Sequence, residues 1–261
     1  MCIRDRVLWL GAVSLALWVA QQRLAEQPQW HQAVASNAIF LIAGTAAIVA
    51  IIRIAKVHFV GGLRGFGLDG RTLAGHLQHA MACLVAIWPV VMAAILLVTW
   101  VGKILHGQDF ELEPHEELKV ISSNPQISLR ILVIVVAVLV APVLEEMLFR
   151  GLLQSAIRSY LERWCEQPAS GQDTAGPTTQ QDPPPAREPV KKRPQRVWLS
   201  VIASSALFAV VHPNLGHWPA LFALSMCLGY AYEKSGSLLQ PIAIHSVFNA
   251  VMVAGVLVGG Q

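Results

Sequence analysis

The chain has 261 residues, of which 54% are hydrophobic and only 13% charged, with a formal net charge of +3 and a mean hydropathy of +0.52. A soluble domain carries about 25% charged residues, so this composition excludes a soluble fold and predicts a protein that crosses the membrane several times. The small net charge gives no sign of a nucleic-acid partner, and the long unbroken apolar blocks argue against a strand-rich barrel, whose strands alternate apolar and polar residues.

Seven apolar blocks follow one another along the chain. They run over residues 7–20, 36–57, 80–102, 129–160, 198–212, 218–232 and 238–258. We therefore expect an all-α fold, a polytopic transmembrane helix bundle of about seven helices. The first block is short, and we interpret it as a membrane anchor because no small-residue cleavage site follows it. Block 129–160 exceeds the ~20 residues that one crossing needs, and we expect a bend at Pro142.

Residues 165–196 differ in kind from the apolar blocks. This segment holds seven of the fifteen prolines together with Gln, Thr and Gly, and it ends in a basic run that includes Lys191 to Arg193. Such a composition cannot bury a core, so we predict a disordered cytoplasmic loop. Its basic end is expected to rest against anionic lipid headgroups.

The positions of Lys and Arg predict the orientation of the chain in a cell membrane. With a cytoplasmic N-terminus, fifteen of the nineteen basic residues fall on the cytoplasmic side. The four exceptions are Arg23, Lys103, Lys119 and Arg130. Because cytoplasmic loops carry the excess of basic residues, we predict a cytoplasmic N-terminus and an outside C-terminus.

Two adjacent acids interrupt the longest apolar block. Glu145 and Glu146 lie in the run ILVIVVAVLVAPVLEEMLFRGLL, where an acid at the helix centre costs roughly 2.5–3.5 kcal/mol. Arg150 stands four residues after Glu146 and can pair with it on one helical face, whereas Glu145 is rotated by about 100°. This spacing predicts one anchored carboxylate and one available for chemistry. The alternative is a salt-bridge cluster with a structural role only.

Polar side chains also enter the fifth and seventh blocks. Phe208 precedes His212 by four residues in SALFAVVHP, and His245 precedes Asn249 by four in PIAIHSVFNA. A single His on an apolar helix is usually a satisfied core residue, and Phe208 fits a packing role in its apolar surroundings. Two membrane-embedded histidines on different helices, beside a buried carboxylate pair, instead predict that these side chains converge on one site.

The three motifs EExxxR, FxxxH and HxxxN, in this order on successive helices, resemble those of the CPBP family of intramembrane endopeptidases. This is the CAAX-protease and bacteriocin-processing group, also called Abi. The resemblance covers residues 128–256, so we expect N-terminal transmembrane helices over 1–127 and a CPBP-like protease core over 128–256 that carries the insert 165–196. Each motif is weak alone, and the three in order are specific.

The resemblance implies hydrolysis of a peptide bond in a membrane-associated protein or peptide, of CAAX type or lipid-modified. Glu145 would be the general base that activates water, and His212 would share or orient that water. His245 and Asn249 would stabilise the oxyanion. A carboxylate in a low-dielectric site binds protons more strongly, and neutral donors in a dry site suit a developing alkoxide.

Glu146 and Arg150 would hold this constellation in place, with Phe208 in support. The resemblance also opens a metal-dependent alternative, because Glu145, His212 and His245 could hold zinc. The chain lacks an HExxH motif, so we expect no required cofactor and prefer the metal-free glutamate mechanism.

Two other functions compete with proteolysis. One is a non-catalytic membrane protein of the same fold that acts as a bacteriocin-immunity factor or scaffold and recruits a partner through 165–196. The other is a proton-coupled transporter, since buried Glu and His also build proton relays, but the chain shows no internal repeat of the kind such transporters favour.

Several weaker patterns point to structure rather than chemistry. Residues 65–70 match GxGxxG but follow an apolar block rather than a strand, which favours a turn over a dinucleotide site. Gly255 and Gly259 predict close helix packing. The acidic stretch from Glu111 to Glu117 predicts a solvated face, and the four scattered cysteines predict neither a disulfide framework nor a thiolate metal site.

Overall fold

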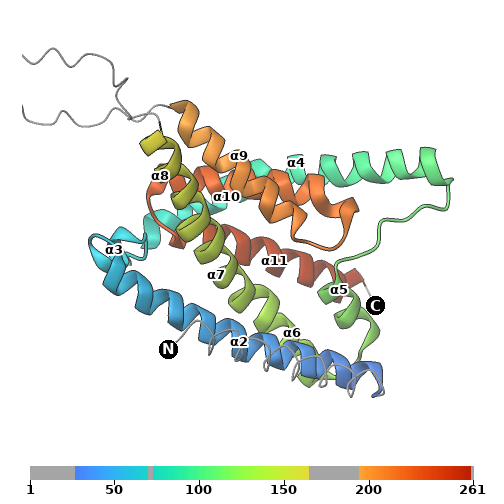
Figure 1. The fold of residues 1–261 in the computed structure, drawn as a ribbon. Coiled ribbons are helices and arrows are strands. Elements are labelled where there is room, and N and C mark those ends of the chain that lie inside the picture. The colour runs from blue at the N-terminus through green and yellow to red at the C-terminus, as the bar shows by residue number, and fades with distance from the viewer. Residues whose placement is uncertain (1–26, 70–72, 165–193, 260–261) are drawn as a thin grey trace, which may run out of the picture. The chain divides into compact units, whose positions relative to one another are not determined.

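A computed structural model describes residues 27–69, 73–164 and 194–259, and the regular structure in these ranges is entirely helical (Figure 1). This confirms the all-α fold. The predicted anchor 7–20 and residues 165–193 of the predicted loop lie outside the described residues. The prediction was wrong for 194–196, which begin helix α9 (Pro194–Val210), because proline is well tolerated in the first turn of a helix.

Four helices in the described ranges are long and apolar enough to cross a membrane, which confirms a multi-pass membrane protein. They are Gln29–His58, Gln78–His106, Ile127–Arg163 and Leu239–Gly259. Helix α9 has only 17 residues, which at 1.5 Å per residue is too short for a ~30 Å hydrocarbon core. The fifth and sixth apolar blocks therefore form helices but, unlike the four helices above, these are not both long and apolar enough to cross a membrane.

The chain folds into two compact units, each built from separated stretches of sequence. Among the described residues, the first unit contains 27–62, 113–144 and 242–259, and the second contains 63–69, 73–112, 145–164 and 194–241. The chain passes from the first unit to the second between Leu144 and Glu145, and it returns after Pro241. The motif residues are therefore shared between two separately described units.

In the first unit, helix α2 packs beside the start of the long helical run that carries the acidic motif (Figure 1). The helices of this unit are α2 (Gln29–His58), α5 (Glu116–Ser123), α6 (Ile127–Val135), η2 (Val136–Val140) and most of α11 (Leu239–Gly259). Their shared core consists of Leu118, Ile121, Leu129, Val133 and Val253. Gly44 lets α2 approach η2 closely, since a Cβ there would lie 3.0 Å from Val140 Cγ1.

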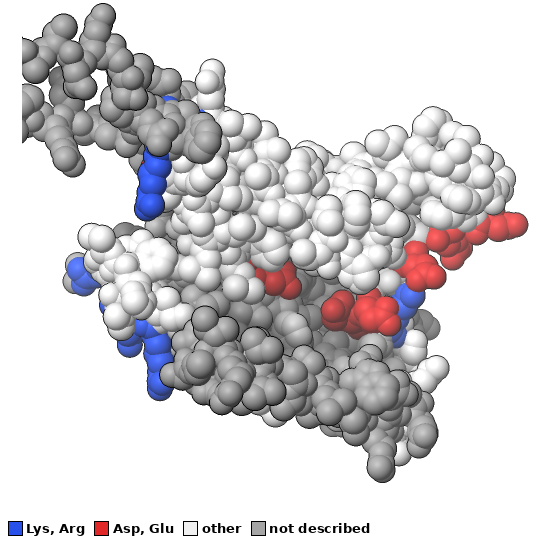
Figure 2. Space-filling model, in the orientation of Figure 1, with Lys and Arg blue, Asp and Glu red and all other residues white. Residues whose placement is uncertain are grey.

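The acidic stretch before and within α5 is exposed, as its composition predicts, and it is visible as red side chains in Figure 2. Glu116 and Glu117 occupy the first turn of α5, where negative charge complements the helix dipole. Lys119 donates a 2.6 Å hydrogen bond to Glu113, and this bond holds the pKa of Glu113 below its ordinary value. These charges lie on a solvated face.

The longest apolar block forms one uninterrupted helical run from Ile127 to Trp164 that contains two π-helical segments. Its parts after η2 are α7 (Ala141–Glu146), the π-helical segment η3 (Met147–Gln154) and α8 (Ser155–Trp164). The helix continues through Pro142, which lies just beyond the π-helical η2. A proline removes one backbone donor from a helix, and a π segment is a common way of accommodating such a defect.

In the second unit, helix α10 (Trp218–Ser235) packs against both α4 (Leu73–His106) and α9, as Figure 1 shows. The short elements α3 (Gly62–Gly65) and η4 (Leu215–His217) complete the set. A small apolar core forms where α9 meets α10. It contains Phe208, Ala209 and Leu221, with Phe149, Trp218 and Phe222 packed against it.

The GxGxxG segment serves as a packing turn in this unit. The carbonyl of Gly67 accepts a 2.8 Å bond from Leu238 N–H and a 3.3 Å bond from Ser237 Oγ. Phe66 is fully buried against Gly151, where a Cβ would come within 2.5 Å of its ring. By contrast, the close packing predicted at Gly255 is not found: within the described ranges, no atom beyond that helix's own neighbourhood lies within 4 Å of a Cβ placed there.

Candidate active site

The acidic motif holds a fully buried ion pair. Arg150 donates from Nη1 to Glu146 Oε1 at 3.1 Å, and its Nε lies 3.1 Å from Glu146 Oε2, with both side chains completely excluded from solvent. The predicted pairing of these two residues is thereby confirmed. It follows from the local geometry of a helix, which places positions four apart on one face.

Arg150 also reaches two other helices of the second unit. Its Nη2 donates to the carbonyl of Ser225 at 3.0 Å and to Ser225 Oγ at 2.7 Å, both on α10. The guanidinium lies 5.0 Å from the centre of the Phe208 ring, which is itself fully buried on α9. A buried charge is tolerable only when it is paired and hydrogen-bonded, and Arg150 meets that requirement with partners from three elements.

Glu145 occupies a different environment from its neighbour. Its side chain is half-buried, whereas that of Glu146 is fully buried. The charge of Glu145 also acts on the Arg150 guanidinium, in addition to the ion pair that Arg150 forms with Glu146. Adjacent positions on a helix point about 100° apart, which explains how the Glu146 carboxylate is enclosed while the Glu145 side chain is only half-buried.

His212 lies in the turn that follows α9 rather than within the helix, which corrects its predicted place in a membrane-embedded helical block. The next residue is Pro213, and the residue before a proline is disfavoured in the helical conformation. His212 Nδ1 lies 2.7 Å from the carbonyl oxygen of Phe208. A carbonyl can only accept, so Nδ1 is the donor, and a neutral ring then carries its lone pair on Nε2.

The third motif lies on α11 in the first unit. His245 is buried with 5% of its surface exposed, and Asn249 is half-buried one turn further along. The amide of Asn249 donates a 2.8 Å hydrogen bond from Nδ2 to the backbone carbonyl of Ala137 in η2. One donor of this predicted oxyanion residue is therefore already engaged by the protein.

The structure thus brings Glu146, Arg150, Phe208 and His212 together in the second unit, with Phe208 ring contacts to Arg150 and to His212 at 5.0 and 4.9 Å. The gathering of Glu145, His212 and His245 around one water stays a prediction. No group of three His, Cys, Asp or Glu within the described ranges is arranged to hold a metal ion. Glu145, His212 and His245 belong to two units that are described separately, so the zinc site that they could form also stays a prediction.

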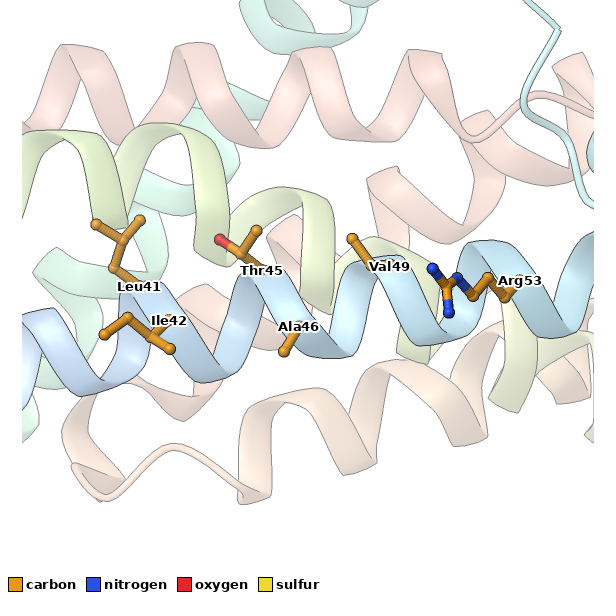
Figure 3. A pocket seen from close by; sticks show the side chains of 6 residues that line it. All are labelled: Leu41, Ile42, Thr45, Ala46, Val49 and Arg53. Carbon is orange, nitrogen blue, oxygen red and sulfur yellow. The ribbon is translucent and has the colours of Figure 1, made fainter.

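A separate shallow groove of about 550 Å³ runs along α2 in the first unit (Figure 3). None of the motif residues lines it. Its side chains are Leu41, Ile42, Thr45, Ala46, Val49 and Arg53.

Comparison with protein families identifies the segment that carries this site. Residues 127–251 match the family model described as type II CAAX prenyl endopeptidase, Rce1-like. The chain carries an Rce1-like domain. This finding agrees with the CPBP resemblance of the three motifs, and it supports a CAAX-type intramembrane endopeptidase in general. Searches of curated proteins and of solved structures find no match.

The Rce1-like domain contains a polar ladder that sequence reasoning missed. Contacts of 2.7, 3.3 and 2.8 Å join the run η3–α8 to α10 at a constant offset of 75 residues along the chain. The paired residues are Arg150 with Ser225, Gln154 with Gly229, and Arg158 with Glu233. The constant offset means that the two helices run in the same direction. The sequence does contain a pattern that indicates this ladder: polar or small residues recur every four positions in both segments, which places them on one face of each helix.

Proposed function

We propose that the Rce1-like domain hydrolyses a peptide bond of a membrane-associated protein or peptide with Glu145 as general base. The observation that carries this proposal is the contrast between neighbouring carboxylates. Glu146 is enclosed in a buried pair with Arg150, while Glu145 beside it stays half-buried. A general base must reach a water and accept its proton, and the greater exposure of Glu145 supports its choice for this role.

In the proposed reaction, Glu145 takes a proton from water as the water oxygen attacks the scissile carbonyl carbon. His212 orients this water through Nε2, a role supported by the tautomer that its bond to Phe208 imposes. His245 donates to the oxygen that becomes negatively charged, and the proton held by Glu145 passes to the leaving amine as the C–N bond breaks. Glu146, Arg150 and Phe208 hold the site, and membrane lipid surrounds it.

The proposed substrate class is a CAAX-type or otherwise lipid-modified chain. Purified protein in detergent is expected to cleave a lipid-modified peptide in ¹⁸O-labelled water and to place one ¹⁸O atom in the new carboxylate, detected by mass spectrometry. A transmembrane peptide without the lipid serves as the comparison substrate. Since the proposal needs no metal, preincubation with a chelator is expected to leave the rate unchanged, whereas chelator inhibition reversed by added zinc would favour the metal-dependent alternative.

We also propose that the chain lies in the membrane with a cytoplasmic N-terminus. Arg53 and Lys56 near the end of α2 would then lie inside, and the acidic segment after α4 would lie outside. Alkaline phosphatase inserted after Phe110 is therefore expected to be active, and a fluorescent protein at the same position dark. An inactive phosphatase and a bright fluorescent protein would overturn this orientation, but they would not bear on the proposed reaction.

A further inference from the structure

The π segment η2 leaves one backbone carbonyl without its usual helical partners. In an α-helix the carbonyl of Ala137 would accept from Ala141 N–H, but that N–H donates to Val136 in the π arrangement. In a continued π-helix Ala137 would accept from residue 142, which is a proline and has no N–H. Ala137 is buried, with 8% of its surface exposed, so water is a poor substitute.

A side chain from a distant helix fills this place. Asn249 on α11 donates from Nδ2 to the Ala137 carbonyl at 2.8 Å, a short bond between positions 112 residues apart. Both residues lie in the first compact unit. Buried backbone carbonyls are almost always satisfied, and here the donor comes from the motif that also contains His245.

We propose that Asn249 is a positioning residue, whose amide replaces the backbone N–H that Pro142 lacks and so fixes α11 against η2. This hydrogen bond constrains both the rotation and the axial register of α11. His245 stands one turn before Asn249 on the same helix, so the same bond sets its direction and depth. This second consequence rests on the role proposed above for His245, whereas the link between Pro142 and Asn249 does not.

A double-mutant cycle tests the link, with the apparent unfolding midpoint in detergent as readout. Asn249→Leu keeps the branched shape and the number of heavy atoms of the side chain but removes the donor, and we expect it to lower the midpoint by about 3–10 °C. Pro142→Ala restores a backbone N–H at position 142. In that background, we expect Asn249→Leu to cost less than half as much, because the restored N–H can serve Ala137.

The matched control is Asn37→Leu on α2. Asn37 also donates to a carbonyl, that of Ala33, but within its own helix, so its loss should leave the midpoint nearly unchanged in both backgrounds. Equal losses for Asn249→Leu with and without Pro142→Ala would overturn the link. If N249L alone does not fold, recovery of folded protein in the double variant is the expected result, and its failure would count against the inference.

Activity provides the readout that separates positioning from direct contact with substrate. The P142A/N249L variant is expected to regain at least part of the turnover that N249L loses, since the geometry of α11 is restored while the amide is still missing. Recovery of the midpoint without any recovery of turnover would overturn the positioning role. A chain with no proteolytic activity at all would disprove the proposed function, yet the stability cycle would still test the link between Pro142 and Asn249.

Discussion

Replacement of Glu145 by Gln is expected to lower kcat/KM by about 10²- to 10⁴-fold, the usual contribution of a general base. Gln keeps the size of the side chain and its capacity for hydrogen bonds but cannot take a proton from water. The loss should fall on kcat rather than KM, because the base acts in the transition state and not in substrate binding. Initial rates with a lipid-modified peptide measure both parameters.

The matched control for this variant is Glu117→Gln on α5, which removes an equivalent carboxylate from an exposed position and should leave the rate unchanged. The unfolding midpoint of E145Q should remain near that of the wild type, since Glu145 is only half-buried and the Glu146–Arg150 pair is intact. Wild-type turnover by E145Q would remove Glu145 from the base role. Full cellular function of both E145Q and His212→Ala would favour the non-catalytic scaffold.

The features that the sequence predicted best are those set by neighbours along the chain. The pairing of Glu146 with Arg150 follows from a four-residue spacing, and the helices follow from the length of the apolar blocks. The end of α9 before His212 is also set by a neighbour along the chain, because Pro213 disfavours the helical conformation of the residue before it. It was missed because the apolar pattern of the block continues past Val210, where the helix stops.

Features that depend on contacts between distant segments were not predicted. Ser225 is one small polar residue in an apolar block, and only the fold shows that it accepts from Arg150, 75 residues earlier. The π segments escape a search for helical periodicity because they add residues to a turn without changing the apolar composition. The hydrogen bond to the Ala137 carbonyl combines both effects, because Pro142 removes the local donor and the distant Asn249 supplies another.

Burial, rather than distance, is expected to decide what the ion pairs contribute to stability. Arg150→Met should lower the apparent unfolding midpoint by about 6–20 °C, since breaking a buried pair costs about 3–5 kcal/mol and each kcal/mol corresponds to ~2–4 °C in a chain of this size. The variant would leave the Glu146 carboxylate in a fully enclosed site and would remove both bonds to Ser225. Tryptophan fluorescence in detergent, at one fixed scan rate, measures the midpoint.

Two comparisons make this prediction specific to a buried charge. Lys119→Met breaks an ion pair that is shorter, at 2.6 Å, but exposed, and it should leave the midpoint unchanged within error. Adding Glu146→Leu to Arg150→Met should recover much of the lost stability, because neither charge then remains in the apolar interior. If R150M behaved like K119M, or if the double variant were less stable than R150M, the pair would not be the buried anchor of the acidic motif.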